Sequence, residues 1–511
     1  MANLKAMTVR ALRELARKHI GPGFSKLKTK SEIVAALAAA LPPDGLIAEP
    51  EGLAPYECDG LTAYRARPLA VVLPRSTAEV SQVLKLCRQL GVKAVPRGAG
   101  TGLSGGALPL ADGVLVSLGK LNCILEIDFA NRCVVAQPGV TNLAITKAVE
   151  GRGFYYAPDP SSQLACSIGG NVAENSGGVH CLKYGVTTNN LLGVEVVLMN
   201  GEVMRFGGKA LDSPGYDVLG VLTGSEGLLG IVTEVTVRIL RKPPSAKALL
   251  IGFARIEQAG AAVAAVIAAG IIPAGLEIMD ALAIQAAENF VHAGYPLDVE
   301  ALMIAELDGP EAEVEHLVGR VREIAEREGA VSVRISRDEA ERERFWAGRK
   351  SAFSAAGQMS PDYYVMDGTI PRRKLPEILG RIRALSQDYG LRVANVFHAG
   401  DGNLHPLILY DGNEPGSFEK AEALGGDILK ACVEAGGVLT GEHGVGVEKR
   451  DLMGTMFSEV DLDQQQRVKC AFDPDGLLNP GKVFPILRRC AELGRLHVHR
   501  GELSFPELPR F

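Results

Sequence analysis

Three histidines and one glutamate fall in two short glycine-rich motifs of the C-terminal half. The first motif, HAGDGNLH, contains His398 and His405, and the second motif, GEHG, contains Glu442 and His443. Two histidines with one carboxylate suit a divalent transition metal that keeps open coordination positions. His398 is expected to end one strand and His405 to begin the next, so both can face one point across a hairpin. We therefore predict that His398, His405 and Glu442 bind a metal such as Zn, Fe or Mn; the alternative is a hydrogen-bonded polar cluster.

Two glycine-rich stretches of the N-terminal half have the composition of a site for an anionic cofactor. They are PRGAGTGLSGGA, at residues 96–107, and residues 157–185. Ordered glycine costs backbone entropy, so such a run indicates main chain that passes close to a ligand, and successive N–H groups can bind anions. The first stretch matches GxGxxG, but a dinucleotide fold needs a helix directly after it, and further glycine and proline follow instead. We interpret the two stretches as a diphosphate cradle with Arg97 beside it.

Arg349 lies in RFWAGRKSAF, a predicted helical segment that contains the only tryptophan of the chain. The ordinary explanation is a solvated charge on a helix. If the helix covers the cofactor, the guanidinium fork of Arg349 suits a substrate carboxylate.

The composition is that of a folded globular protein. The 511 residues correspond to about three domains, and 47% of them are hydrophobic and 22% charged. A net charge of −6 gives no broad basic field, so we expect no nucleic-acid binding. The nine cysteines lack a CxxC motif and regular spacing. This pattern argues against a zinc ribbon, an iron–sulfur cluster or a disulfide framework in this chain.

The cysteine pattern favours a reducing compartment. The N-terminus has no apolar segment typical of a signal peptide, and the longest apolar run, residues 259–272, is short for a membrane span. We expect a cytoplasmic protein that meets the inner face of a membrane only through a partner.

Changes in glycine content and periodicity divide the chain into four parts. Residues 1–45 are predicted to form a helical appendage, and residues 46–242 a mixed α+β domain that holds the cofactor. Residues 243–440, which begin at Pro243-Pro244, are predicted to form a second α+β domain, with an antiparallel sheet and helices on one face. Residues 441–511 are expected to return to the cofactor site.

Taken together, the motifs resemble those of one family. PRGAGTGLSGGA, CSIGGNVAENSGG, LTGSEGLLGIVTEVTV, HAGDGNLHP, GEHG and LNPGK are similar to motifs of FAD-linked 2-hydroxyacid oxidases and dehydrogenases of the vanillyl-alcohol-oxidase type. Residues 360–373 and 490–511 resemble most the FAD-linked subunits of bacterial glycolate oxidases. The resemblance implies an α+β fold: a PCMH-type FAD-binding domain of two α/β subdomains, covered by an α+β cap domain with an antiparallel sheet.

The resemblance also implies where FAD binds. The diphosphate is expected on the first glycine loop and on main chain within residues 157–178. Some members tether FAD through a histidine at the position of Thr101, so we expect non-covalent FAD here. The residues expected to contact FAD are Arg97, Gly98, Ala99, Gly100, Thr101, Gly102, Gly139, Asp159, Pro160, Ser162, Ser167, Gly169, Gly170, Asn171, Asn175, Gly177, Gly178, Glu226, Gly230, Ile231, Val232 and Asn479.

The implied chemistry is the oxidation of a small 2-hydroxy acid. A metal would bind the hydroxyl and carboxylate oxygens, His443 would act as the general base, and Arg349 would hold the carboxylate. The hydride would pass to flavin N5. Residues 363–367 offer no cation for a second carboxylate, which favours glycolate or D-lactate, although the basic run at residues 372–374 follows closely.

Electrons are expected to leave through a partner, because the chain has no cluster motif. The resemblance implies a second flavoprotein-like subunit and an iron–sulfur subunit that feeds membrane quinones. Two alternatives stay open: a stand-alone D-lactate dehydrogenase, and a non-catalytic, flavin-containing assembly subunit.

Overall fold

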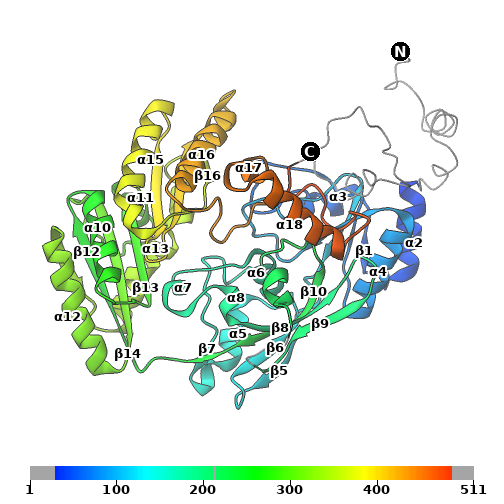
Figure 1. The fold of residues 1–511 in the computed structure, drawn as a ribbon, viewed down its shortest axis with the longest axis horizontal. Coiled ribbons are helices and arrows are strands. Elements are labelled where there is room, and N and C mark those ends of the chain that lie inside the picture. Colours follow the sequence, from blue (N-terminus) through cyan, green and yellow to red (C-terminus); the bar gives the residue numbers. More distant parts are fainter. Residues whose placement is uncertain (1–28, 211–214, 486–511) are drawn as a thin grey trace.

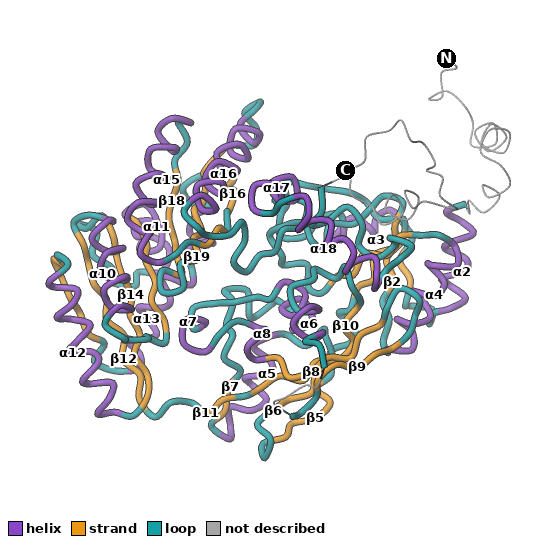
Figure 2. The backbone as a smooth tube through the Cα atoms, viewed as in Figure 1, coloured by secondary structure: helices purple, strands orange, loops and turns teal. Residues whose placement is uncertain are grey.

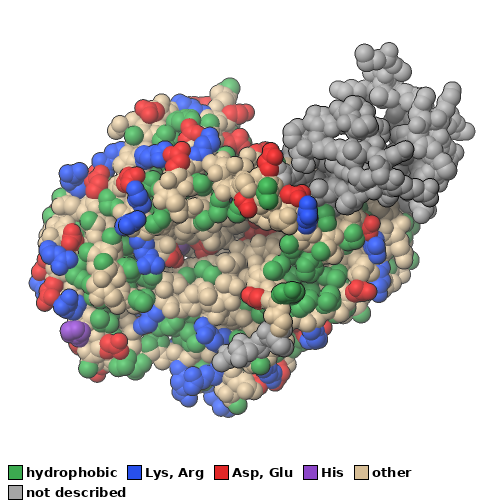
Figure 3. Space-filling view, in the orientation of Figure 1, with side chains coloured by type: hydrophobic (Ala, Val, Ile, Leu, Met, Phe, Trp, Pro, Cys, Tyr) green, Lys and Arg blue, Asp and Glu red, His purple; other side chains and the backbone are tan. Residues whose placement is uncertain are grey.

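A computed structural model describes residues 29–210 and 215–485. The first helix of the predicted appendage and the segment at 490–511 lie outside the described residues. Figure 1 shows the sheet domain of the C-terminal half beside the N-terminal domain, with the last helices lying over the N-terminal domain. On the face shown in Figure 3, basic and acidic side chains are interspersed rather than gathered by sign.

The first sheet of the N-terminal domain is small and mostly parallel. Its strands, in spatial order, are β1 (Leu46–Ile47), β2 (Ala70–Val72), β4 (Gly113–Ser117) and β3 (Lys93–Arg97). Helix α4 (Thr77–Leu90) begins at Ser76, whose hydroxyl accepts the Glu79 N–H, and ends at Gly91 in the left-handed region. Helix α2 (Lys30–Ala40) packs Ile33 and Leu37 into the same apolar cluster as α4, so this part of the predicted appendage lies against the first domain.

The second sheet of this domain is antiparallel, and the first residues of one of its strands line a cavity. Its strands, in spatial order, are β5 (Ile124–Asp128), β6 (Cys133–Ala136), β10 (Ile231–Arg238), β8 (Leu191–Val197) and β9 (Val203–Gly207). Every second residue of β10 is buried, which is the period of a half-buried strand. Strands β8 and β9 form a hairpin, and Asn200-Gly201 lies in its connection. Helices α5 (Asn142–Val149), α6 (Ile168–Glu174) and α9 (Val218–Leu222) pack on this sheet.

The C-terminal domain is built on one eight-stranded antiparallel sheet. Its strands, in spatial order, are β15 (Ala330–Ile335), β12 (Ser245–Phe253), β14 (Ala301–Gly309), β13 (Gly275–Asp280), β18 (Val393–His398), β19 (Asn403–Tyr410) and β16 (Asp362–Val365), with β17 (Gly368–Thr369) on β19. Together with the helices, this sheet confirms the predicted α+β class.

Helices cover both faces of that sheet, so the prediction of helices on one face is wrong. Strand β12 turns Leu249 and Ile251 to one apolar cluster and Ala248 and Leu250 to the other. A strand that is apolar on both faces must be covered twice. One layer contains α10 (Ile256–Ala268), α12 (Glu311–Arg327), α15 (Leu375–Tyr389) and α16 (Ser417–Glu434), and the other contains α11 (Ala281–Val291), α13 (Glu339–Lys350) and α14 (Ala352–Ala356).

The chain finally returns to the N-terminal domain through α17 (Met453–Met456) and α18 (Glu459–Phe472) (Figure 2). Leu478 forms a parallel bridge with Ala94 of β3, and the Lys469 ammonium in α18 donates to the Leu228 and Leu478 carbonyls. Among the described residues, no helix combines the length and the apolar character that a bilayer crossing needs.

Helix α2 should contribute to the stability of the whole N-terminal domain. The Leu37 side chain is fully buried, so Leu37→Ala should lower the free energy of unfolding by about 2 to 5 kcal/mol, measured by chemical denaturation. The control Val460→Ala, at a position 69% exposed in α18, should change it by less than about 0.5 kcal/mol. Equal effects would contradict this packing.

Candidate active site

A cavity of about 390 Å³ lies where the two domains and the returning segment meet. The N-terminal domain contributes the loop after β3, the start of α6 and the start of β10 to its wall. The C-terminal domain contributes Phe353, Tyr363 and His398, and the returning segment contributes Glu442 and His443. Both groups of sequence motifs, glycine-rich and histidine-rich, therefore line one space.

The loop after β3 has the features of an anion cradle. The N–H groups of residues 98–103 donate no hydrogen bond to any described part of the chain, so they are available to a ligand. Gly100 has a φ of 73°, and a Cβ there would collide with the Arg97 guanidinium. A Cβ on Gly98 would collide with the Ser167 hydroxyl. The close packing of this loop against Arg97 and Ser167 thus favours glycine, and its free N–H groups fit the diphosphate of FAD.

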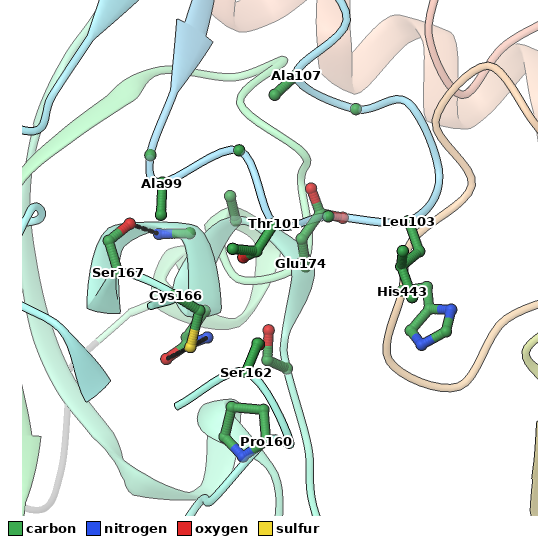
Figure 4. Close-up of a pocket in the computed structure, with 18 of the residues that line it drawn as sticks. Ala99, Thr101, Leu103, Ala107, Pro160, Ser162, Cys166, Ser167, Glu174 and His443 are labelled. Carbon is green, nitrogen blue, oxygen red and sulfur yellow. Dashed lines mark hydrogen bonds between the residues drawn. The ribbon is translucent and has the colours of Figure 1, made fainter. Parts of the chain in front are cut away.

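Most residues predicted to contact FAD lie on the cavity wall. Figure 4 shows Ala99, Thr101, Ser162 and Ser167 around the cavity, with the Ser167 hydroxyl accepting the Gly170 N–H. The predicted residues on the wall are Arg97, Gly98, Ala99, Gly100, Thr101, Gly102, Pro160, Ser162, Ser167, Gly169, Gly170, Asn171, Glu226, Gly230, Ile231 and Val232.

The other predicted FAD residues lie behind the wall and support it. A Cβ on Gly139 would meet the Leu118 and Leu121 carbonyls, and a Cβ on Gly178 would meet the Asp159 backbone. Asn175 ends α6 in the left-handed region, and its side-chain oxygen accepts the Thr188 N–H at 2.8 Å.

Asn479 and Gly177 tie distant segments together. The Asn479 side chain donates to the Gly106 carbonyl at 3.1 Å and to the Glu226 carbonyl at 2.7 Å, so it joins the cradle loop to the turn before β10. The Gly177 N–H donates to Glu442 Oε2 at 2.9 Å. The second glycine-rich stretch therefore also holds a residue of the predicted metal site.

The predicted metal ligands converge on one oxygen atom. His405 Nε2 lies 3.1 Å and His398 Nε2 3.3 Å from Glu442 Oε1. The Nδ1 atoms face away from that point: His398 Nδ1 lies 2.8 Å from Glu277 Oε1, and His405 Nδ1 lies 3.3 Å from the Met366 carbonyl. Partners on Nδ1 orient each ring and turn its Nε2 atom toward Glu442, the orientation found in histidine metal sites.

The pKa values of Glu442 and His398 are set by the groups that pair with them. Burial alone would raise the pKa of Glu442, but hydrogen bonds with His398 and His405 outweigh it and hold that pKa well below its ordinary range. Burial alone would lower the pKa of His398, but Glu277 and Glu442 raise it well above its ordinary value.

Asp367 organises the GEHG loop rather than the cation site. By distance, the ligand atoms of Asp367, His405, Glu442 and His443 lie within 4.8 Å of one another, whereas the predicted ligand His398 is not a member of that group. However, Asp367 Oδ2 already accepts the N–H groups of Gly441 and His443, at 3.0 and 2.8 Å. We therefore assign Asp367 to loop positioning.

His443 is placed to accept a proton. Its ring stacks on His405 with centroids 4.9 Å apart, and its Nδ1 has no hydrogen-bond partner within the described chain. Burial, helped by His405 and Lys449, lowers the pKa of His443 to about 4, although Asp367 opposes the shift. The imidazole is therefore neutral near pH 7, as a base must be.

Arg349 lies behind the cavity wall rather than on it. Its side chain is fully buried, and its Nε donates to Glu277 Oε2 at 2.8 Å. Its Nη1 makes no hydrogen bond within the described chain. The clamp role of Arg349 stays a prediction.

Comparisons with known proteins identify the family of the chain. The family model "FAD binding domain" matches residues 68–207, and "FAD linked oxidases, C-terminal domain" matches residues 242–483. The chain is 58% identical to "Glycolate oxidase subunit GlcD" of Escherichia coli (strain K12), over 94% of this chain and 97% of that protein. The chain belongs to the FAD-linked oxidase family.

Two further members of this family are also similar to the chain, and one of them has a different name. GlcD of Bacillus subtilis (strain 168) is 40% identical over 84% of this chain and 92% of its own length. A "D-lactate dehydrogenase" of Anaerostipes hadrus is 35% identical over 83% of this chain and 91% of its own.

Solved structures confirm the predicted PCMH-type fold. A p-cresol methylhydroxylase structure superposes with a TM-score of 0.75 at 18% identity, over 89% of this chain and 97% of that one. A 4-ethylphenol oxidase from Gulosibacter chungangensis gives 0.75 at 18%, over 90% and 98%.

Three acidic residues of this FAD-linked oxidase site were missed from the sequence. Glu277 lies in the apolar strand GLEIMD, where a buried charge was the available signal. Asp367 is likewise a charged residue in an apolar segment, at the end of YYVMD. Glu174 lies on the cavity wall inside a stretch analysed only for its glycines and asparagines.

One further cluster joins the two domains beside the cavity. His180, just before α7 (Cys181–Tyr184), lies between Asp159, 2.9 Å from its Nδ1, and Glu306 of β14, 3.4 Å from its Nε2. Burial alone would lower the pKa of His180, but Asp159 and Glu306 outweigh it and raise this pKa to about 10. The predicted FAD residue Asp159 thus pairs with His180 in a domain contact.

The His180 contact should stabilise the fold in a pH-dependent way. Its folded pKa of about 10 exceeds the ordinary 6.5, so the stabilisation is complete below pH 6.5 and is lost as the pH rises through 10. His180→Asn should therefore lower the free energy of unfolding much more at pH 6.5 than at pH 10. The exposed control His316→Asn should show no such difference, and an equal loss at both pH values for His180→Asn would contradict the ion pairs.

Proposed function

We propose that this protein is the FAD-bearing subunit of a glycolate oxidase and oxidises glycolate to the 2-oxo acid. The observation that carries the proposal is the inward orientation of His398 Nε2 and His405 Nε2 toward Glu442, on the same cavity as the FAD cradle and His443. The 58% identity to GlcD supports the substrate.

Different residues of the chain have different roles in the proposed reaction. Residues 98–103 would hold the FAD diphosphate through main-chain N–H groups, and the flavin would supply the hydride acceptor. His398, His405 and Glu442 would hold a divalent cation, which would supply a Lewis acid for the substrate hydroxyl. His443 accepts the hydroxyl proton in its neutral form. Arg349 pairs from behind the wall with Glu277, which in turn orients His398.

The cavity favours a small monocarboxylate. Tyr363 and Val365 line it, whereas the basic residues of the 3-10 helix Arg372–Lys374 do not. The cations on the wall are Arg97, in the cradle, and Lys350, which lies 3.8 Å from Asp159. A second carboxylate would thus lack a free cation beside the reacting carbon.

The proposal also includes a partner that takes the electrons from FAD. The GlcD relatives are named as subunits of an oxidase, which supports a multi-subunit enzyme, and we propose an iron–sulfur partner that passes electrons to membrane quinones. The protein itself would be cytoplasmic and would contact the membrane through its partners. A stand-alone D-lactate dehydrogenase is the second candidate, favoured by the relatives that carry that name.

The substrate is tested by anaerobic bleaching of the flavin absorbance of purified protein. Glycolate should bleach it faster than D-lactate, and 2-hydroxy dicarboxylates should act more slowly than either. Faster bleaching by D-lactate would favour the second candidate, and no bleaching by any 2-hydroxy acid would refute the catalytic proposal.

The matched variant for that experiment is His443→Gln, which keeps a polar side chain of similar size. It should retain FAD and lose about 10²- to 10⁴-fold in the bleaching rate, because the proton acceptor is gone. A rate equal to that of the original protein would exclude His443 as the base.

The proposed metal site is tested with a variant of Glu277, the hydrogen-bond partner of His398. Glu277→Gln should weaken metal binding roughly 10- to 100-fold, because it changes the partner that orients His398. Metal content after dialysis against graded chelator measures this, with Glu442→Gln as a variant that lacks a ligand. Glu448→Gln, a buried glutamate outside the cluster, should keep its metal. If all three variants retain metal equally, the cluster is only a hydrogen-bonded network.

A further inference from the structure

Three largely apolar side chains line the cavity from the C-terminal domain: Phe353 of α14, and Tyr363 and Val365 of β16. Side chains alternate along a strand. Tyr364, between the two residues of β16, packs into the apolar cluster on the other face of the sheet, whereas Val365 belongs to the cluster beneath α11, α13 and α14. Tyr363 and Val365 therefore lie on the same face of the sheet as α14, and with Phe353 they form one apolar part of the cavity wall.

The Phe353 ring lies beside the predicted metal ligands. It meets the His405 ring edge to face, with centroids 6.1 Å apart and an interplanar angle of 65°. The His405 ring in turn lies 5.1 Å from the His398 ring and 4.9 Å from the His443 ring, centroid to centroid. One ring thus separates Phe353 from the proposed base. The apolar part of the wall therefore adjoins the end of the cavity where the proposed reaction occurs.

The packing of α14 and β16 fixes the position of the Phe353 ring. Ala352 and Ala356 of α14 are buried in the cluster between this helix and the sheet, and Phe353 packs against the same cluster. On the strand side, Val365 pairs with Leu407 of β19, two residues after His405. Helix and strand are thus positioned by the sheet that carries His405, so the distance between the apolar wall and the metal ligands is set by the fold.

The two kinds of wall suit the two ends of a 2-hydroxy acid. Its carboxylate and hydroxyl oxygens are polar, and they match His398, Glu442 and His443 on the wall. The remaining substituent on C2 is a hydrogen atom in glycolate and an alkyl group in larger acids. An alkyl group gains nothing beside charged or hydrogen-bonding groups, whereas apolar side chains remove it from water.

We propose that Phe353 limits the size of the substituent on C2, and that Tyr363 and Val365 complete the pocket that receives this substituent. The pocket accepts a hydrogen atom or a methyl group. Longer chains are disfavoured because the Phe353 ring, packed against His405, occupies the space that they need. The inference rests on the proposed oxidation of a 2-hydroxy acid, and it names the residue that selects among these acids.

The experiment compares 2-hydroxy acids of increasing length by anaerobic bleaching of the FAD-loaded protein. The series is glycolate, D-lactate, D-2-hydroxybutyrate and D-2-hydroxyhexanoate, and the second-order rate constant should be smallest for the longest acid. Phe353→Ala should raise the ratio of the rate constant for D-2-hydroxyhexanoate to that for glycolate about 10-fold or more, because each methylene that a pocket accepts or rejects is worth about 10- to 200-fold. Phe353→Leu should raise this ratio by a smaller factor.

The ratio distinguishes selection from structural damage, because a damaged site would oxidise all the acids more slowly and keep the ratio. Phe290→Ala makes the same chemical change at an exposed position of α11 and should leave the ratio unaltered. If Phe353→Ala does not retain FAD, Phe353→Leu decides the question. A ratio that neither variant of Phe353 changes would overturn the inference, and so would an original protein that oxidises every acid of the series equally fast.

Isothermal titration calorimetry with the corresponding 2-oxo acids separates this inference from the proposed function, because binding needs no turnover. The dissociation constant should rise with chain length in the original protein and rise less steeply in Phe353→Ala. Flavin that no 2-hydroxy acid bleaches, in a protein with these graded dissociation constants, would refute the proposed oxidation alone. Flavin that glycolate bleaches, with ratios and dissociation constants that Phe353→Ala leaves unchanged, would refute the role of Phe353 alone.

Discussion

The loop from Gly441 to Gly446 is held from two sides by two buried carboxylates, and the site depends on this constraint. Asp367, from the sheet domain, accepts N–H groups at the beginning of the loop, and Glu226, from the N-terminal domain, accepts N–H groups at its end. The loop carries Glu442 and His443 between these anchors. Hydrogen bonds from backbone N–H to a buried carboxylate are short and strong, so the loop cannot shift without exposing one of these charges.

This anchoring explains how one site forms from two domains. The sheet domain places His398 and His405 across the β18–β19 hairpin, where His398 pairs with Asn403 in the strand register. The N-terminal domain holds Glu442 through Gly177 and also provides the cofactor cradle. The domains are therefore joined at the residues that we propose to do the chemistry.

Several buried charged side chains of the molecule are paired in series. Arg349 pairs with Glu277, Glu277 with His398, and His398 with Glu442. Each member compensates the next, which is the condition under which ionised groups tolerate burial.

The sequence by itself determined the chemistry and much of the local structure. Residue types and short spacings predicted the metal-type cluster, the glycine cradle and the α+β class, because each depends on neighbours within a few residues. Only the tertiary structure decided which groups act as anchors. Glu226 reaches the GEHG loop across 219 residues and Gly177 reaches Glu442 across 265, separations that no local pattern encodes.

The same reason explains the errors and omissions. Helices on one face were predicted because periodicity reports that a helix is amphipathic but not which face of a sheet it covers. Arg349 was expected on the wall, yet its helix is packed so that Glu277 lies between the guanidinium and His398. The sequence thus predicted His398, His405, Glu442 and His443, while packing decided which carboxylates lie beside them, because a buried charge can be paired only by groups that the fold brings next to it.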